Sequence, residues 1–90
     1  MILYMQAKEV RAVKVKIKKQ PEKYLKKTDT VTYKKLINAI EGLKNLEGDI
    51  IKLKGSEKYR LKIYHYRVIF TCDSEDTITI EEIGSRGDIY

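Results

Sequence analysis

Basic side chains occupy every second position in two nearby segments of this sequence. Lys52 and Lys54 do so in one segment, Arg60 and Lys62 in the next, and Arg67 opens the segment that follows. In β-strands, such alternation puts the basic residues on one face and the intervening apolar residues on the other. Closely spaced cations can neutralise the charge of a phosphodiester under attack and can lower one another's pKa toward a useful acid or base. If the two strands pair in register, this face has the charge that phosphodiester chemistry needs, although a lysine-bearing face is more often only the solvated side of a half-buried sheet.

The charge of the chain is unevenly distributed. The 90 residues include 19 Lys and Arg and 13 Asp and Glu, for a net charge of +6. Residues 1–35 carry eleven bases and three acids, whereas residues 68–90 carry one base and six acids. A basic region of this kind is attracted to polyanions such as nucleic acid. Solvated lysine-rich faces are also common, so charge alone leaves both interpretations open.

Other kinds of site lack the residues that they need. The single Cys72 cannot form an internal disulfide, and with one histidine there is no Cys/His set for zinc. We therefore expect no metal and no cofactor. The uncharged segment 1–7 is too short for a signal peptide or a spanning helix. We expect a cytoplasmic protein without membrane contact.

Hydrophobic periodicity predicts the elements that must position the basic residues. Alternation over 9–18 predicts a strand, Pro21 opens a short helix over 21–27, and apolar residues at helical spacing predict a longer helix over 30–46. After Gly48 the pattern is that of four strands, in the segments 51–54, 59–64, 66–72 and 77–83. We expect a hairpin turn at Tyr64-His65, although neither residue favours a positive φ.

These elements predict one domain over residues 1–90 of the α+β class, in the order β-α-α-β-β-β-β. The sheet is expected to be an antiparallel meander with both helices packed on one face. Ile51 would then meet the helices, and the basic residues of both strands would share the free face. Arg67 and Arg86 would lie outside the core. Function should be sought on the free face.

A series of short motifs follows in the second half of the chain: Leu53-Lys54-Gly55, Tyr59-Arg60-Leu61, Tyr66-Arg67-Val68-Ile69-Phe70 and Ile83-Gly84-Ser85-Arg86-Gly87-Asp88-Ile89-Tyr90. In order and spacing, this series resembles the RelE/ParE superfamily of bacterial toxins from toxin–antitoxin pairs, most of all the RelE-like mRNA interferases. The similarity spans about 40% of the chain. The N-terminal half resembles the family only in its plan of one strand and two helices.

The resemblance implies a RelE-like fold and a ribosome-dependent, metal-independent endoribonuclease that cleaves mRNA in the A site. The 2′-hydroxyl would attack the adjacent phosphate and leave a 2′,3′-cyclic phosphate. Carried over by position, catalysis falls to a basic pair, a strand arginine and two residues near the C-terminus: Lys52, Lys54, Arg67, Arg86 and Tyr90. Arg60 and Lys62 would bind RNA. Which residue serves as acid and which as base stays open.

The implied partners are the ribosome with its mRNA and a cognate antitoxin, in a possible toxin–antitoxin hetero-oligomer. The sequence departs from the family at Tyr64-His65, where relatives often have Gly-Asp, and at Ser85, where many have His. A lysine-based variant of the chemistry is therefore expected. Two alternatives are a ParE-like DNA gyrase inhibitor without nuclease activity and a catalytically silent RNA-binding member. The basic residues matched above favour the nuclease over the gyrase inhibitor.

Overall fold

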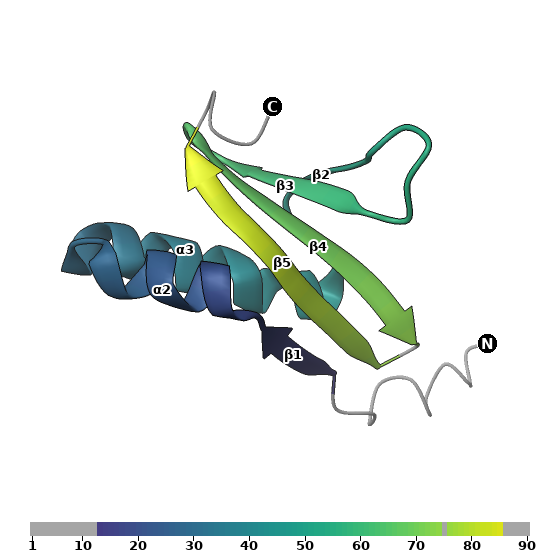
Figure 1. The fold of residues 1–90 in the computed structure, drawn as a ribbon, viewed down its shortest axis with the longest axis horizontal. Helices are drawn as coiled ribbons and strands as arrows, with labels where there is room; N and C mark the ends of the chain where they lie inside the picture. The colour runs from purple at the N-terminus through teal and green to yellow at the C-terminus, as the bar shows by residue number, and fades with distance from the viewer. Residues whose placement is uncertain (1–12, 75, 86–90) are drawn as a thin grey trace.

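The protein folds as two helices against one sheet (Figure 1). The computed structural model describes residues 13–74 and 76–85. Along the chain the elements are β1 (Lys14–Ile17), α2 (Lys19–Lys27), α3 (Thr30–Gly42), the 3₁₀ turn η1 (Leu43–Asn45), β2 (Asp49–Lys52), β3 (Tyr59–Ile63), β4 (Tyr66–Ser74) and β5 (Thr77–Ser85). The predicted α+β class and element order are confirmed.

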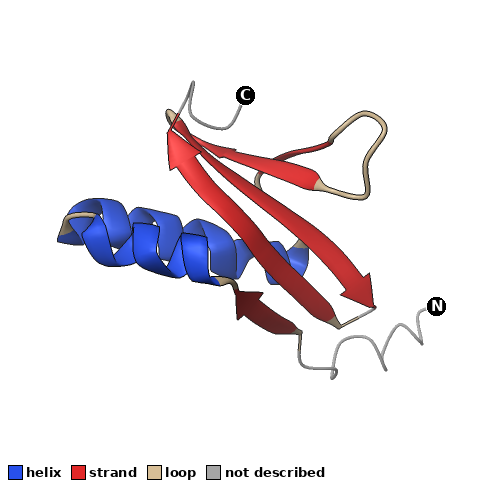
Figure 2. Cartoon of the chain, viewed as in Figure 1, coloured by secondary structure: helices blue, strands red, loops and turns tan. Residues whose placement is uncertain are grey.

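The sheet has five strands in the order β1-β5-β4-β3-β2. Strands β2 to β5 form the predicted antiparallel meander. Strand β1 adds a parallel pair, with Lys14 opposite Thr77 and Ile17 opposite Ile80, so the sheet is mixed. The two helices lie side by side and form a layer to one side of the strands (Figure 2).

Local sequence explains where the helices begin. Pro21 sits in the first turn of α2, where its missing N–H has no intrahelical partner to lose. Asp29 is the N-cap of α3, and its Oδ1 accepts a hydrogen bond from the backbone N–H of Thr32 at 2.7 Å. Hydrogen bonding from the Thr32 side chain, and next from this backbone N–H, holds the pKa of the Asp29 carboxyl below its ordinary value, with a smaller contribution from the charge of Lys35.

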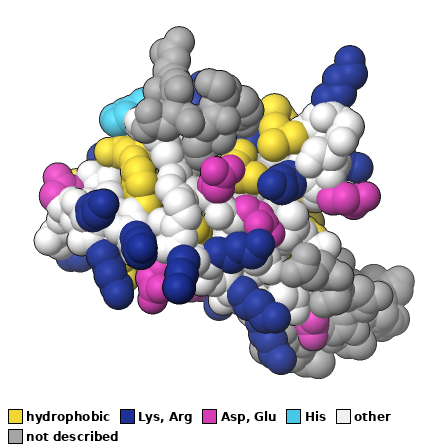
Figure 3. Space-filling model, in the orientation of Figure 1, with side chains coloured by type: hydrophobic (Ala, Val, Ile, Leu, Met, Phe, Trp, Pro, Cys, Tyr) yellow, Lys and Arg dark blue, Asp and Glu magenta, His cyan; other side chains and the backbone are white. Residues whose placement is uncertain are grey.

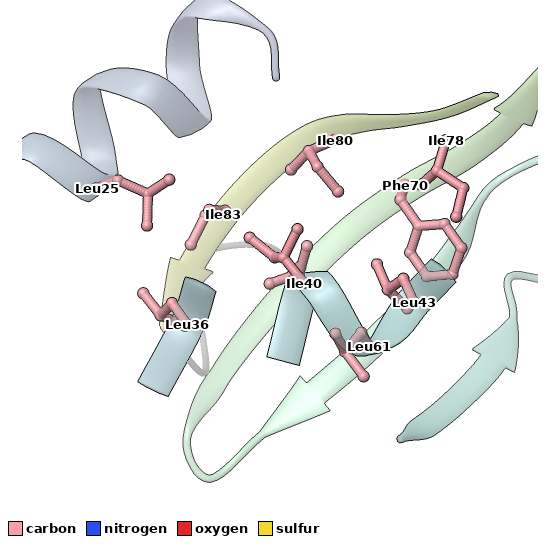
Figure 4. Close-up of a cluster of buried hydrophobic side chains, with 10 residues drawn as sticks. Leu25, Leu36, Ile40, Leu43, Leu61, Phe70, Ile78, Ile80 and Ile83 are labelled. Atoms are coloured by element: carbon pink, nitrogen blue, oxygen red, sulfur yellow. The ribbon is translucent and has the colours of Figure 1, made fainter. Parts of the chain in front are cut away.

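The core lies between the helices and one sheet face (Figure 4). Helical side chains meet alternating side chains of β3, β4 and β5 there: Leu25, Leu36, Ile40, Leu43, Leu61, Val68, Phe70, Ile78, Ile80 and Ile83. Phe70 also stacks on Tyr59 of the neighbouring strand, with ring centroids 5.5 Å apart. This alternation fixes which face of each strand turns away from the helices.

A side-chain amide continues the sheet where β1 ends. The last backbone bond between these segments runs from the N–H of Lys18 to the carbonyl of Ile80. Beyond it, Gln20 accepts from the N–H of Ile83 through Oε1 and donates to its carbonyl through Nε2, both at 2.9 Å. The first turn of α2 is thereby fixed to β5 close to Gly84 and Ser85.

The β3–β4 hairpin turns at Tyr64-His65, as predicted, and it does so with a strained residue. Tyr64 has a φ of 55°, in the left-handed region that costs a non-glycine residue about 1–2 kcal/mol. The guanidinium of Arg67 donates from Nη1 to the carbonyls of Tyr64 (3.3 Å) and Tyr66 (3.1 Å). These two bonds hold the turn from inside.

Candidate nucleic-acid interface

Three cations share the sheet face opposite the helices. Lys62 pairs directly with Arg67, and Arg60 pairs with Ile69 in the adjacent row. Directly opposed residues point to the same face, and their strand neighbours Leu61 and Val68 are in the core. We call this surface, made by Arg60, Lys62, Arg67, Ile69 and Glu82, the helix-free face.

The predicted alignment of β2 with this face is wrong. Ile50 pairs with Leu61 and Lys52 with Tyr59, so Lys52 points to the helix side of the sheet. Ile51, which was expected to meet the helices, lies opposite Arg60 and is 44% exposed. The pairing differs from the expected one by a single residue, which exchanges the two faces of a strand.

Lys54 does not belong to a strand at all. Strand β2 ends at Lys52, and the chain turns through Leu53 to Ser56, with the N–H of Ser56 bonded to the carbonyl of Leu53 at 3.2 Å. Gly55, the third residue of this turn, has a φ of 70°, which type II turns require and glycine adopts easily. Lys52 and Lys54 instead line an open hollow of about 620 Å³ in the β2–β3 loop.

Arg60 carries a hydrogen-bond donor that the described residues leave unused. Its Nε is buried and has no partner among the described residues. Its cross-strand neighbour Ile69 is only 2% exposed although it faces away from the helices. A buried guanidinium nitrogen without a partner is costly, and an anionic ligand would remove that cost. Arg60 is therefore a stronger anion-binding candidate than its solvated neighbours.

Arg67 was predicted to lie outside the core, but in the structure it is buried. It is 9% exposed, and its Nη1 is engaged by the two hairpin carbonyls. Gly84 lies directly opposite Arg67 on β5 and has no side chain to crowd it. The cation is thus held in one place, and its replacement would disturb the hairpin as well as any ligand.

A carboxylate absent from the predicted site lies among these cations. Glu82 pairs with Ile69 and is therefore a diagonal neighbour of Arg67, at a Cβ separation of about 7 Å. A bulge in β5 leaves Glu81 unpaired between Ile80 and Glu82. Glu81 is bonded to the ammonium of Lys18 at 2.6 Å and to the hydroxyl of Thr71 at 3.1 Å. The sequence shows that β5 carries two adjacent carboxylates, Glu81 and Glu82. The bulge is what turns Glu82 toward the helix-free face.

Figure 3 shows acidic side chains in the middle of one view of the molecule, with lysines and arginines on either side of them. On the helix-free face, the cations supply charge stabilisation for a phosphate, and Glu82 supplies a carboxylate that can accept a proton. Within the described residues, no group of three or more His, Cys, Asp or Glu could hold a metal ion.

Comparisons with known proteins give the fold an identity. No family model and no curated protein sequence matches the chain. Among solved structures, a chain of the RelB–RelE antitoxin–toxin complex from Methanococcus jannaschii has a TM-score of 0.69 and 27% identity, over 83% of this chain and 94% of that one. The chain therefore has the fold of the RelE-like toxins.

Two further solved structures share this RelE-like fold. The toxin–antitoxin complex RelBE2 from Mycobacterium tuberculosis has a TM-score of 0.67 and 17% identity, over 88% of this chain and 97% of that one. The intact RelBE complex of E. coli has a TM-score of 0.64 and 20% identity, over 82% and 96%. The resemblance inferred from short motifs is therefore confirmed.

The RelE-like chain brings together only part of the predicted site. Arg60, Lys62 and Arg67 share one face, whereas Lys52 and Lys54 lie at the β2–β3 loop. Arg86 and Tyr90, also predicted for catalysis, fall outside the described residues.

None of the described helices is both long and apolar enough to cross a bilayer.

Proposed function

We propose that this chain is the toxin of a toxin–antitoxin pair and acts as a metal-independent endoribonuclease on mRNA in the ribosomal A site. The observation that carries the proposal is the cluster of Arg60, Lys62 and Arg67 on the helix-free face, with the Nε of Arg60 buried and unpartnered among the described residues. The similar solved structures are toxin–antitoxin complexes, which supports the biological setting.

In the proposed cleavage of the phosphodiester, each charged side chain of the helix-free face has a separate role. Arg60 and Arg67 neutralise the charge that develops on the phosphate as the 2′-hydroxyl oxygen attacks phosphorus. Glu82 accepts the proton of that hydroxyl, and Lys62 donates a proton to the departing 5′-oxygen. The products are a 2′,3′-cyclic phosphate and a 5′-hydroxyl. This assignment replaces Lys52 and Lys54 by Arg60 and Lys62 as the basic pair; Arg86 and Tyr90 remain candidates for contacts to the leaving group and the base.

The ribosome has a physical role in this proposal. A side chain that transfers a proton contributes most when the attacking nucleophile is already aligned with the phosphate. A codon held in the A site supplies that alignment, and the lysine-rich helices attract ribosomal RNA. The toxin would thus act in the cytoplasm, and its partner would be an antitoxin that forms a hetero-oligomer with it and covers the basic face or an edge of the sheet.

The decisive experiment mixes purified protein with ribosomes stalled on a short message. We expect cleavage inside the A-site codon, a 2′,3′-cyclic end, and much slower cleavage of the same RNA free in solution. A message with one 2′-deoxynucleotide at the scissile position is the matched control, because it lacks the attacking hydroxyl and should stay intact. Intact messages together with loss of DNA gyrase supercoiling would instead assign the chain to the ParE-like inhibitors.

A further inference from the structure

Aromatic side chains gather where the β3–β4 hairpin meets the turn between α2 and α3. The rings of His65 and Tyr66 are 4.2 Å apart, and Tyr66 meets Tyr24 edge to face at 6.5 Å. Tyr64, at the turn itself, is 69% exposed. Together with Lys27 and Lys35, these four residues form what we call the hairpin-tip surface.

Tyr64 occupies a position that suits glycine better. Its φ of 55° lies in the left-handed region, and its ring is left largely in water. Burial therefore does not explain a tyrosine at this place. Strained residues that packing does not require are concentrated at binding sites. The two bonds from Arg67 to the hairpin carbonyls hold the backbone of the turn that carries this ring.

Cations adjoin these rings. The ammonium of Lys35 lies 4.7 Å from the centre of the Tyr64 ring, at cation–π distance. One helical turn earlier on α3, Thr32 lines an open hollow of about 370 Å³ together with residues of both helices and the hairpin: Tyr24, Lys27, Thr28, Asp29 and Tyr66. The hollow is within the size range of small-molecule sites, about 300–1,000 Å³.

The charge of this surface fits an anion carrying flat rings. The acidic residue that lines the adjoining hollow, Asp29, already accepts the N–H of Thr32 as the helix cap. Lys27 and Lys35 are both exposed, so their ammonium groups can reach a ligand. Single-stranded RNA combines phosphates with unstacked bases, and such bases stack on tyrosine and histidine rings.

The hairpin tip also continues the proposed cleavage site. Arg67 belongs to the helix-free face, and its guanidinium contacts the carbonyls of Tyr64 and Tyr66. Two residues along a strand, about 7 Å, separate the Lys62–Arg67 pair from the turn. Tyr66, the strand neighbour of Arg67, faces the helices, so an RNA strand bound at the cations would reach the aromatic rings by passing around the end of the hairpin.

We propose that the hairpin-tip surface binds an unpaired stretch of RNA, with bases stacked on Tyr64 and His65 and phosphates held by Lys27 and Lys35. The inference rests on the proposed action on RNA and adds a second contact region outside the cleavage site. It assigns a function to the Tyr64-His65 turn that the cleavage chemistry does not use.

The test measures binding without cleavage. The full chain is titrated into a labelled 2′-O-methyl RNA of ten nucleotides, which has no 2′-hydroxyl to attack, and binding is followed by fluorescence anisotropy. Tyr64→Gly removes the ring and relieves the positive φ, so we expect about tenfold weaker binding with an unchanged or higher melting temperature. Tyr64→Trp should retain the affinity. Tyr33→Ala, which removes an exposed tyrosine of α3, is the matched control and should bind like the parent.

Duplex RNA of the same sequence separates stacking from charge. We expect Tyr64→Gly to leave duplex binding unchanged, because paired bases cannot reach the ring. Equal affinity of parent and Tyr64→Gly for the single strand would overturn the inference, as would equal losses on single strand and duplex. Loss of antitoxin binding alone would assign the surface to a protein partner and overturn it too. The ribosome assay is independent, so a chain that cleaves nothing can still pass this test.

Discussion

The two faces of the sheet use the same strands for opposite purposes. On the helix side, Leu61, Phe70 and Ile80 are almost fully buried and contact one another and the helices. On the helix-free face, the residues between them include Arg60, Lys62 and Glu82, which carry charge. The first face is defined by apolar volume and the second by the positions of a few charges. Substitutions should therefore affect stability on one face and RNA chemistry on the other.

The largest expected effect is on the helix side. Phe70→Ala should lower the free energy of unfolding by about 3–5 kcal/mol, because it removes a buried ring and leaves a cavity. Urea unfolding followed by circular dichroism measures the change. Lys62→Ala, on the other face of the adjacent strand, is the control and should change stability by less than about 0.5 kcal/mol. Similar losses for both variants would contradict the division between the faces.

The second prediction concerns the helix-free face. The double variant Arg60→Gln, Lys62→Gln should lose about 100-fold in mRNA cleavage on ribosomes, since it removes two groups that stabilise a charged transition state. Its stability should stay within about 1 kcal/mol of the parent.

Lys52→Gln with Lys54→Gln provides the matched comparison, because it removes the same charge from the β2–β3 loop. We expect less than a tenfold loss in cleavage there. Equal losses in the two double variants would mean that non-specific attraction, rather than the helix-free face, governs activity.

The third prediction compares the same substitution at two glycines. Gly48 has a φ of 122°, and a Cβ built there would lie 2.6 Å from Cδ1 of Leu61. Gly48→Ala should therefore cost about 1–3 kcal/mol. Gly42 ends α3 with a helical φ of −63° and room for a methyl group. Gly42→Ala should stabilise by about 0.5–1 kcal/mol. Thermal unfolding of both variants tests the opposite signs.

The smallest effect is a pH dependence in the helical layer. Hydrogen bonding from the side chain and the backbone N–H of Thr32 lowers the pKa of Asp29 below its ordinary value of 3.8. Its carboxylate therefore stabilises the fold at pH above that value, and the contribution is lost as the pH falls through the lower pKa of the folded state. Asp29→Asn keeps a capping side chain that does not titrate. The melting temperature of the parent, relative to this variant, should decrease slightly between pH 6 and pH 2.

Sequence periodicity predicted the helix side of the sheet well. The apolar spacing that ends at Leu43 predicted α3, and alternation around Leu61 predicted the inward face of β3. Both patterns repeat over several residues, so a single error in position does not change the outcome.

The helix-free face was harder to predict because it depends on register. Strand β2 has four residues, and a shift of one residue moved Ile51 and Lys52 to the faces opposite to those expected. The bulge that aims Glu82 arises from pairing between strands, and the bonds from Arg67 depend on the left-handed turn at Tyr64. No local pattern in the sequence encodes them.

The parallel pairing of β1 with β5 has a consequence for the order of folding. Lys18 and Glu81, which pair at the end of β1, are 63 residues apart in the chain. Closing a loop of that length costs about 3.7 kcal/mol of chain entropy beyond a constant, whereas the β3–β4 hairpin closes over two residues. Local hairpins can therefore assemble β2 to β5 first. We expect β1 to be the last strand to join the sheet and the first whose amides exchange with solvent when it opens.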